Sequence, residues 1–281
     1  MRGSPVRGGS ALARLSADRL WRWALWAATA LVLAFLVVPI LAVLPLSVND
    51  SRFLTYPLRG FTDRWYIEFF SDPRWTRALA NSAVLAVSSA AIATVLGTLA
   101  ALGLALAEFR GKAVLLALLL SPLVVPVIVF GVGLALFFGQ VGLVRTFPGL
   151  LAAHVALGAP FALLTVGAAL ASFDRTLLRA AQGLGASPAV AFRRVVLPLI
   201  APGVLAGFLF AFATSFDEVV VNIFIAAPEH RTLPREMFSS LRENVSPVIA
   251  AAATLMTLVA AVLLGTMEWL KRRTRRMTVS A

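Results

Sequence analysis

Two adjacent carboxylates, Asp217 and Glu218, directly follow a long apolar run that contains no charged residue. In a continuous helix they lie about 28 Å beyond Pro198, near the far end of that run. Such a helix would gather four polar residues on one face, at three- and four-residue spacing: Thr214, Ser215, Glu218 and Asn222. A carboxylate on this face attracts an ammonium group, and the ring of Phe216 offers the same ligand a cation–π contact. The pattern favours a site for a small organic cation over a pair of hydrated surface acids. It leaves open which acid faces the ligand.

Other kinds of chemistry lack the residues they need. The chain contains no cysteine, which excludes disulfides, thiolate metal sites and cysteine nucleophiles. Gly111-Lys112 lacks the earlier glycine of a phosphate-binding loop, because Leu106 occupies that position. Neither His154 nor His230 has a clustered partner, and His154 is interpreted as a hydrogen-bonded packing residue rather than a proton relay. The sequence therefore predicts no catalytic residue, no metal site and no cofactor.

The composition indicates which solvent surrounds the chain. Hydrophobic residues make up 60% of the 281 residues and charged residues 14%, against roughly 45–50% and 25% in soluble domains. The formal charge of +12 is typical of loops held at the cytoplasmic face of a membrane, and a basic nucleic-acid-binding protein is not this apolar. We therefore expect an all-α polytopic membrane protein that binds no nucleic acid.

Six apolar runs without Asp, Glu, Lys or Arg are long enough to cross a membrane, which takes about 20 residues. They are Trp23–Val48, Ala78–Ala107, Ala113–Val144, Thr146–Phe173, Val195–Phe216 and Asn244–Met267. Only Arg145 separates the third run from the fourth, and a glycine- and proline-containing turn is predicted around it; without that turn the count is five. In the fifth run, Gly203 and Gly207 form a GxxxG pair that is interpreted as helix packing.

The distribution of basic residues orients these helices. With both termini cytoplasmic, 16 of the 25 Lys and Arg residues lie in the inner segments, as the positive-inside rule requires. The predicted organisation is a basic tail (1–22), a first transmembrane helix (23–48), an outer loop (49–77), a core (78–270) and a second basic tail (271–281). The tails are expected to lie flexibly beside anionic lipid. The aromatic outer loop either lies along the membrane interface or forms an ordinary aromatic belt, and both interpretations remain open.

The inner segment 174–194 carries more helix signals than a connector needs. Asp174 can cap a short helix that ends at Gly183 or Gly185, and Ser187-Pro188 then begins a second helix that enters the membrane. Small side chains at Ala180 and Ala181 would permit another protein to approach closely; alternatively, the segment lies on lipid.

This segment resembles the hallmark of the integral membrane subunits of binding-protein-dependent ABC importers, which reads Glu-Ala-Ala, three residues, Gly, nine residues, Ile, one residue, Leu-Pro. The positions that match in number and order are Arg179, Ala180, Ala181, Gly185, Val195, Leu197 and Pro198. The resemblance implies the type I permease fold, with 174–194 as the coupling loop that docks on a separate ATPase. Arg179 departs from the family's Glu, which leaves the role of this one side chain open.

The stretch from Ser215 to Val221, with Leu233-Pro234 and Ser246-Pro247 after it, is similar to the second permease of spermidine/putrescine importers. That resemblance implies a polyamine substrate, two ATPase subunits, a second permease and a periplasmic or extracellular substrate-binding protein. Permeases for opines and aminoethylphosphonate share much of the pattern and are one alternative. A secondary transporter driven by an ion gradient is the alternative from another class, and a homodimer of this chain is as compatible with the sequence as a heterodimer.

Overall fold

The structure, a computed structural model, describes residues 9–171, 173–243 and 245–279. It is helical apart from turns, loops and one isolated bridge in the described chain, between Asn49 and Phe61. The helices are α1 (Gly9–Leu46), α2 (Arg64–Ser71), α3 (Pro73–Leu106), α4 (Lys112–Val124), α5 (Val127–Gln140), α6 (Phe147–Ala171), α7 (Arg175–Gly183), α8 (Pro188–Ala191), the π-helical turn η1 (Phe192–Val196), α9 (Leu197–Phe216), α10 (Val220–Ile225), the 3₁₀ turn η2 (Pro228–His230), α11 (Leu233–Glu243) and α12 (Val248–Val279). The predicted all-α class is confirmed.

Five helical segments of the described chain are long and apolar enough to cross a membrane: Arg19–Leu46, Pro73–Leu106, Phe147–Ala171, Pro188–Phe216 and Val248–Thr266. The third predicted run is not one straight helix, because α4 and α5 meet at 107°, and counting this pair as one span gives six. Val125 at the break is extended, since the ring of Pro126 disfavours the helical conformation of the residue before it. The turn predicted around Arg145 is present, with Gly142 and Arg145 at positive φ.

Helices α3, α6 and α9 form the centre of the bundle, and small residues let them approach closely. A Cβ built on Gly97 of α3 would lie 2.6 Å from the Cβ of Ala162. On α9, a Cβ at Gly203 would lie 2.8 Å from the carbonyl oxygen of Thr165, and one at Gly207 would lie 2.8 Å from the Cα of Ala162. The GxxxG pair is therefore a packing surface toward α6, as predicted.

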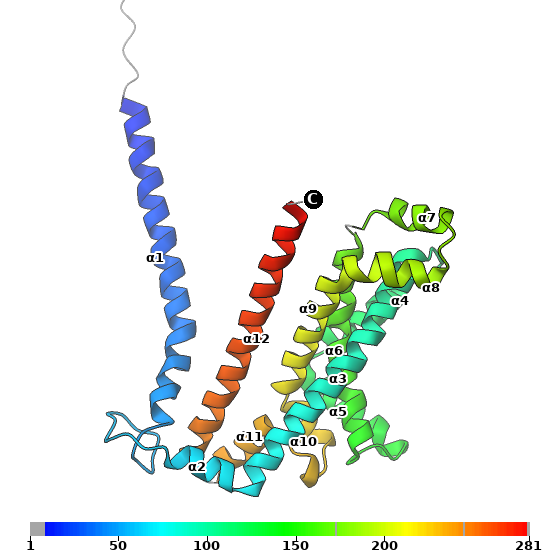
Figure 1. Cartoon of the computed structure of the whole chain (residues 1–281). Helices are drawn as coiled ribbons and strands as arrows, with labels where there is room; N and C mark the ends of the chain where they lie inside the picture. Colours follow the sequence, from blue (N-terminus) through cyan, green and yellow to red (C-terminus); the bar gives the residue numbers. More distant parts are fainter. Residues whose placement is uncertain (1–8, 172, 244, 280–281) are drawn as a thin grey trace, which may run out of the picture.

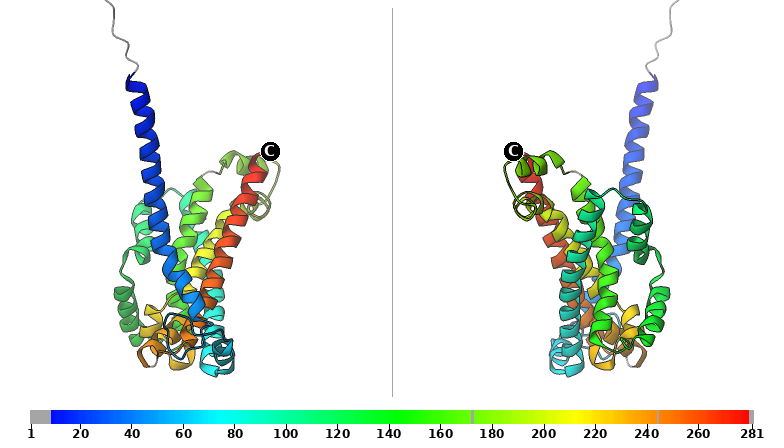
Figure 2. Two further views of the ribbon diagram at one scale, coloured as in Figure 1. Left: turned by 90° about the vertical axis from the view of Figure 1, so that its left-hand side faces the viewer. Right: turned by 90° about the vertical axis from the view of Figure 1, so that its right-hand side faces the viewer.

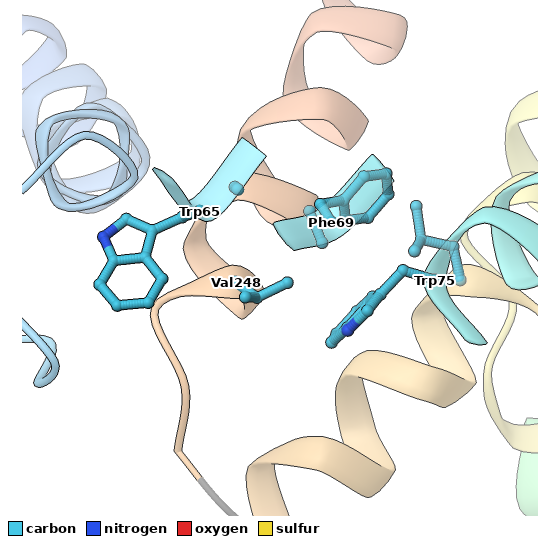
Figure 3. Close-up of a cluster of buried hydrophobic side chains, with 7 residues drawn as sticks. Trp65, Phe69, Trp75 and Val248 are labelled. Carbon is cyan, nitrogen blue, oxygen red and sulfur yellow. The ribbon is translucent and has the colours of Figure 1, made fainter. Parts of the chain in front are cut away.

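Aromatic residues of the predicted outer loop form a buried cluster with α12 (Figure 3). Trp65 and Phe69 on α2, and Trp75 on α3, pack against Val248. The indole Nε1 of Trp65 donates a hydrogen bond of 2.8 Å to the backbone oxygen of Asn49. Neither open interpretation of this segment accounts for these side chains, because their rings join a protein core that connects α2, α3 and α12.

The first helix stands apart from the bundle (Figure 1). Its apolar spanning part is exposed, and it reaches α12 near the end at which α2 lies. Helix continues from Gly9 and as far as Val279, into both segments that were expected to be flexible tails. The views agree that the start of α1, the end of α12 and the helices α7 and α8 lie at one end of the molecule, opposite α2, α10 and α11 (Figures 1 and 2).

Candidate functional site

The segment with the excess of helix signals folds as the sequence predicts. Asp174 caps α7, accepting a hydrogen bond of 2.8 Å from the backbone N–H of Thr176, and hydrogen bonding to the Thr176 side chain and backbone lowers the pKa of Asp174. At the other end, Gly185 has a φ of +86°. Its N–H donates to the carbonyl oxygen of Gln182, and the N–H of Ala186 donates to the carbonyl oxygen of Ala181. This is the Schellman arrangement for ending a helix.

This helical hairpin is anchored on one side and open on the other. Leu178 and Phe192 are partly buried against the core cluster that contains Val166 and Ile200. On the open side, Leu184 is 89% exposed. Exposed with it are Leu177, Arg179, Ala180 and Gly185, whereas Ala181 is half-buried. The hairpin therefore leaves two large apolar side chains, Leu177 and Leu184, exposed at its surface.

The second half of the hairpin enters the bundle through η1. Ser187 is extended and Pro188 occupies the first turn of α8, as predicted. Val195 lies in η1, and Leu197-Pro198 begins α9. Proline lacks an N–H and its ring clashes with the carbonyl four residues before it. The wider π-helical turn directly before Pro198 relieves that conflict without ending the helix.

The expected polar face around the two acids is wrong, because the helix does not continue through them. Helix α9 ends at Phe216. The carboxylate of Glu218 then accepts hydrogen bonds from the first three N–H groups of α10, at 2.9 Å from Val220, 3.0 Å from Val221 and 3.2 Å from Asn222. A side chain that caps a new helix competes with continuation of the old one. Glu218 is therefore buried and fully engaged, whereas Asp217 is exposed.

Ser215 belongs to a buried polar network rather than to an open surface. Its hydroxyl lies 2.7 Å from Nδ1 of His154 and accepts a hydrogen bond of 2.9 Å from Ser89. This network connects α3, α6 and α9, and all three side chains are buried. His154 is thus a hydrogen-bonded packing residue, as predicted, although its Nε2 has no partner within the described chain.

The other residues of the expected site are also distributed differently. Phe216 is buried and stacks on Phe212 with 5.5 Å between ring centroids, so its face is not free for a cation. Asn222 is fully buried and its amide donates a hydrogen bond of 3.4 Å to His230. Thr214 is half-buried. Of the two acids, only Asp217 has a side chain exposed to a ligand.

One residue of this region had no sequence signal. The Arg235 guanidinium of α11 donates hydrogen bonds to the backbone oxygens of Asn222 and Ala226, at 2.9 and 3.1 Å, and lies 3.4 Å from the Asn222 amide oxygen. In the sequence, Arg235 is recognisable only as one of the basic residues of an outer segment. No group of three or more metal-ligating side chains lies close together among the described residues.

Comparisons with known proteins agree with the geometry. A family model described as "Binding-protein-dependent transport system inner membrane component" matches residues 93–276. The chain is 35% identical, over 83% of its length and 88% of the relative's, to the "Spermidine/putrescine transport system permease protein PotC" of Escherichia coli strain K12. It is 34% identical, over 84% of its length and 85% of the relative's, to the "Putrescine transport system permease protein PotI" of the same strain.

A solved structure shares the fold. A bacterial ABC transporter involved in import of the acidic polysaccharide alginate contains a chain that superposes with a TM-score of 0.68 at 17% identity, covering 94% of this chain and 99% of that one. At that identity the match concerns the fold alone. The resemblance drawn from the residues of segment 174–194 and from the stretch after Ser215 is confirmed by the two relatives over most of the chain.

Proposed function

This chain belongs to the family of inner membrane components of binding-protein-dependent transport systems, and we propose that it forms part of the translocation pathway of a polyamine importer, with spermidine or putrescine as substrate. It is a multi-pass inner membrane protein and an ABC importer permease. Family membership leaves no reason to retain the ion-gradient-driven transporter as an alternative. The names of the two relatives support a polyamine over an opine or aminoethylphosphonate.

The observation that carries the substrate assignment is the exposed carboxylate of Asp217. Its neighbour Glu218 is occupied by three backbone N–H groups, so Asp217 is the acid able to meet a primary ammonium group. An ammonium–carboxylate contact is a charge-assisted hydrogen bond, which is stronger than a neutral one. Thr214, half-buried on α9 three residues before Asp217, remains a proposed member of the pathway.

The hairpin 174–194 is the proposed contact with the ATPase. Its exposed side chains include Leu177, Leu184 and Arg179, and Gly185 holds the turn between its two helices. ATP hydrolysis then takes place in two separate ATPase subunits, and this chain hydrolyses nothing itself. An acidic residue on the ATPase would suit Arg179, where relatives of the family carry Glu.

We place both termini and this hairpin in the cytoplasm. The start of α1, the end of α12 and the hairpin lie at one end of the molecule (Figure 1), which supports a shared side of the membrane, and the basic residues of the inner segments select the cytoplasmic side. The opposite end, with α2, α10 and α11, then faces the substrate-binding protein. A second permease completes the proposed pathway.

Uptake of labelled putrescine and spermidine by the assembled system tests the substrate assignment. We expect Asp217→Asn to lower uptake by about tenfold or more, because a hydrogen bond to a charged group contributes about 1.5–3 kcal/mol. The matched control is Glu108→Gln, which neutralises an exposed acid in the loop between α3 and α4, outside the proposed contact with the substrate-binding protein, and should leave uptake unchanged. Wild-type uptake in Asp217→Asn would remove Asp217 from the pathway, and a wild-type system that imports only anions would overturn the polyamine assignment.

A further inference from the structure

Helix α10 is too short to be stable by its own hydrogen bonds. It contains six residues, Val220–Ile225, whereas isolated helices below about 12–15 residues are marginal in water. A helix of this length consists largely of its two ends, where N–H and carbonyl groups lack helical partners. Its conformation therefore depends on groups outside it.

Both ends of α10 are capped by charged side chains of the matching sign. The negative Glu218 accepts hydrogen bonds from the first three N–H groups. The positive Arg235 donates to the carbonyl oxygen of Asn222 in the last turn and to that of Ala226, the C-cap residue. This polarity agrees with the helix dipole, whose N-terminus favours an anion and whose C-terminus favours a cation.

The capped helix α10 packs against α5 through buried apolar side chains. Val221 and Ile225 are fully buried in the cluster that includes Phe138 of α5. A Cβ on Gly131 of α5 would lie 2.9 Å from the ring of Phe224, so the glycine allows α10 to pack this closely. Asp217 is bonded directly to Glu218. Its own N–H donates a hydrogen bond of 3.1 Å to the carbonyl oxygen of Ala213 in α9, so Asp217 is the junction between α9 and the Glu218 cap, and a shift of that cap moves the backbone that carries its carboxylate.

We propose that Glu218 and Arg235 are positioning residues that hold Asp217 toward the transported cation. This inference rests on the proposed function for the role of Asp217, but the geometry of the two caps does not. Arg235 is half-buried, and its Nη1 donates to the carbonyl oxygens of Asn222 and Ala226, so these hydrogen bonds hold the end of α10 and are not made to Asp217. The carboxylate oxygens of Glu218 already accept hydrogen bonds from backbone N–H groups. Glu218 therefore does not replace Asp217 as the group that contacts the transported cation.

The first test measures whether α10 stays packed in its buried position, and it does not depend on transport. Val221→Cys in this cysteine-free chain places a thiol of similar size at a fully buried position. In the purified complex, a cationic, water-soluble methanethiosulfonate reagent should leave it unlabelled. Adding Arg235→Gln should raise the labelling rate about tenfold or more, because the hydrogen bonds from the charged guanidinium keep α10 packed and residue 221 buried. Arg235→Lys, which keeps the charge and one donor position, should restore part of the protection.

The matched control is Arg242→Gln, on the same helix, where the guanidinium is exposed and lies 4.7 Å from the Phe238 ring centroid. It should leave the introduced thiol unlabelled. If that thiol stays protected in both Arg235 variants, Arg235 does not hold α10 and the proposal is wrong. If the Arg235→Gln complex does not assemble, the labelling rate is measured in Arg235→Lys and Glu218→Gln instead. Each of these variants weakens one cap and should also expose the introduced thiol.

The second test asks whether Arg235 acts through Asp217. Polyamine uptake is measured for Asp217→Asn, Arg235→Gln and the double variant, with complex assembly monitored for each. If Arg235 positions Asp217, the double variant loses no more than Asp217→Asn alone, within about twofold, as coupled residues in a cycle do. Losses that multiply would overturn the proposal. Absence of polyamine uptake in the wild type would instead overturn the proposed function, and the labelling result would still stand.

Discussion

Adding one methyl group at Gly207 tests how closely α9 approaches α6. The new Cβ would lie 2.8 Å from the Cα of Ala162 and 2.7 Å from the hydroxyl oxygen of Thr165, well inside the ~3.5–4.0 Å of a relaxed carbon contact. A backbone atom of α6 cannot rotate away, so the helices have to separate. Overpacking of this kind costs about 1–3 kcal/mol. Helix propensity opposes it, because Ala is favoured over Gly by about 1 kcal/mol within a helix.

Gly167→Ala on α6 is the matched control, because nothing lies within 4 Å of the Cβ it would add. The propensity gain is common to both variants, so the difference between them isolates the steric cost of about 1–3 kcal/mol. At about 2–4 °C per kcal/mol, Gly207→Ala should melt several degrees below Gly167→Ala when both are heated in one detergent and followed by tryptophan fluorescence. Equal melting temperatures would refute the close contact between α9 and α6.

Four further outcomes are expected. Gly185→Val forces a side chain into a φ of +86°, at a cost of about 1–2 kcal/mol, and should lower transport-coupled ATP hydrolysis with membrane insertion intact; normal coupling would contradict this. Ser215→Ala leaves Nδ1 of His154 buried without its partner and should destabilise by about 1–3 kcal/mol, measured by thermal denaturation; an unchanged stability would show that the network contributes nothing. Phe69→Ala removes a fully buried ring from the cluster of Figure 3 and should cost about 3–5 kcal/mol in the same assay, whereas a loss below about 1 kcal/mol would contradict its burial. A cysteine at Ser187 should react with an impermeant thiol reagent only from the cytoplasmic side, and labelling from outside would reverse the proposed topology.

Much of the architecture follows from signals that act between sequence neighbours. Asp174, Gly185 and Ser187-Pro188 are recognisable because a cap, a left-handed turn and a first-turn proline each depend on a few adjacent residues. The apolar runs predict spanning helices for the same reason, since a membrane requires each segment to satisfy its own backbone. The bent α4–α5 pair is the partial exception: Pro126 marks the break but not its angle of 107°.

The candidate site depended on contacts that no local pattern contains. The spacing alone predicts an unbroken helix through Asp217 and Glu218. In the structure, backbone N–H groups donate to the Glu218 carboxylate at the start of a new helix, and Arg235 of α11 donates to carbonyl oxygens at its other end. Ser215 pairs with His154 across 61 positions of the chain. By itself the sequence determined the fold class, the hairpin 174–194 and the presence of two acids. Only the tertiary structure decided that one acid caps a helix and the other remains exposed, because that outcome depends on which distant groups packing brings within hydrogen-bond distance.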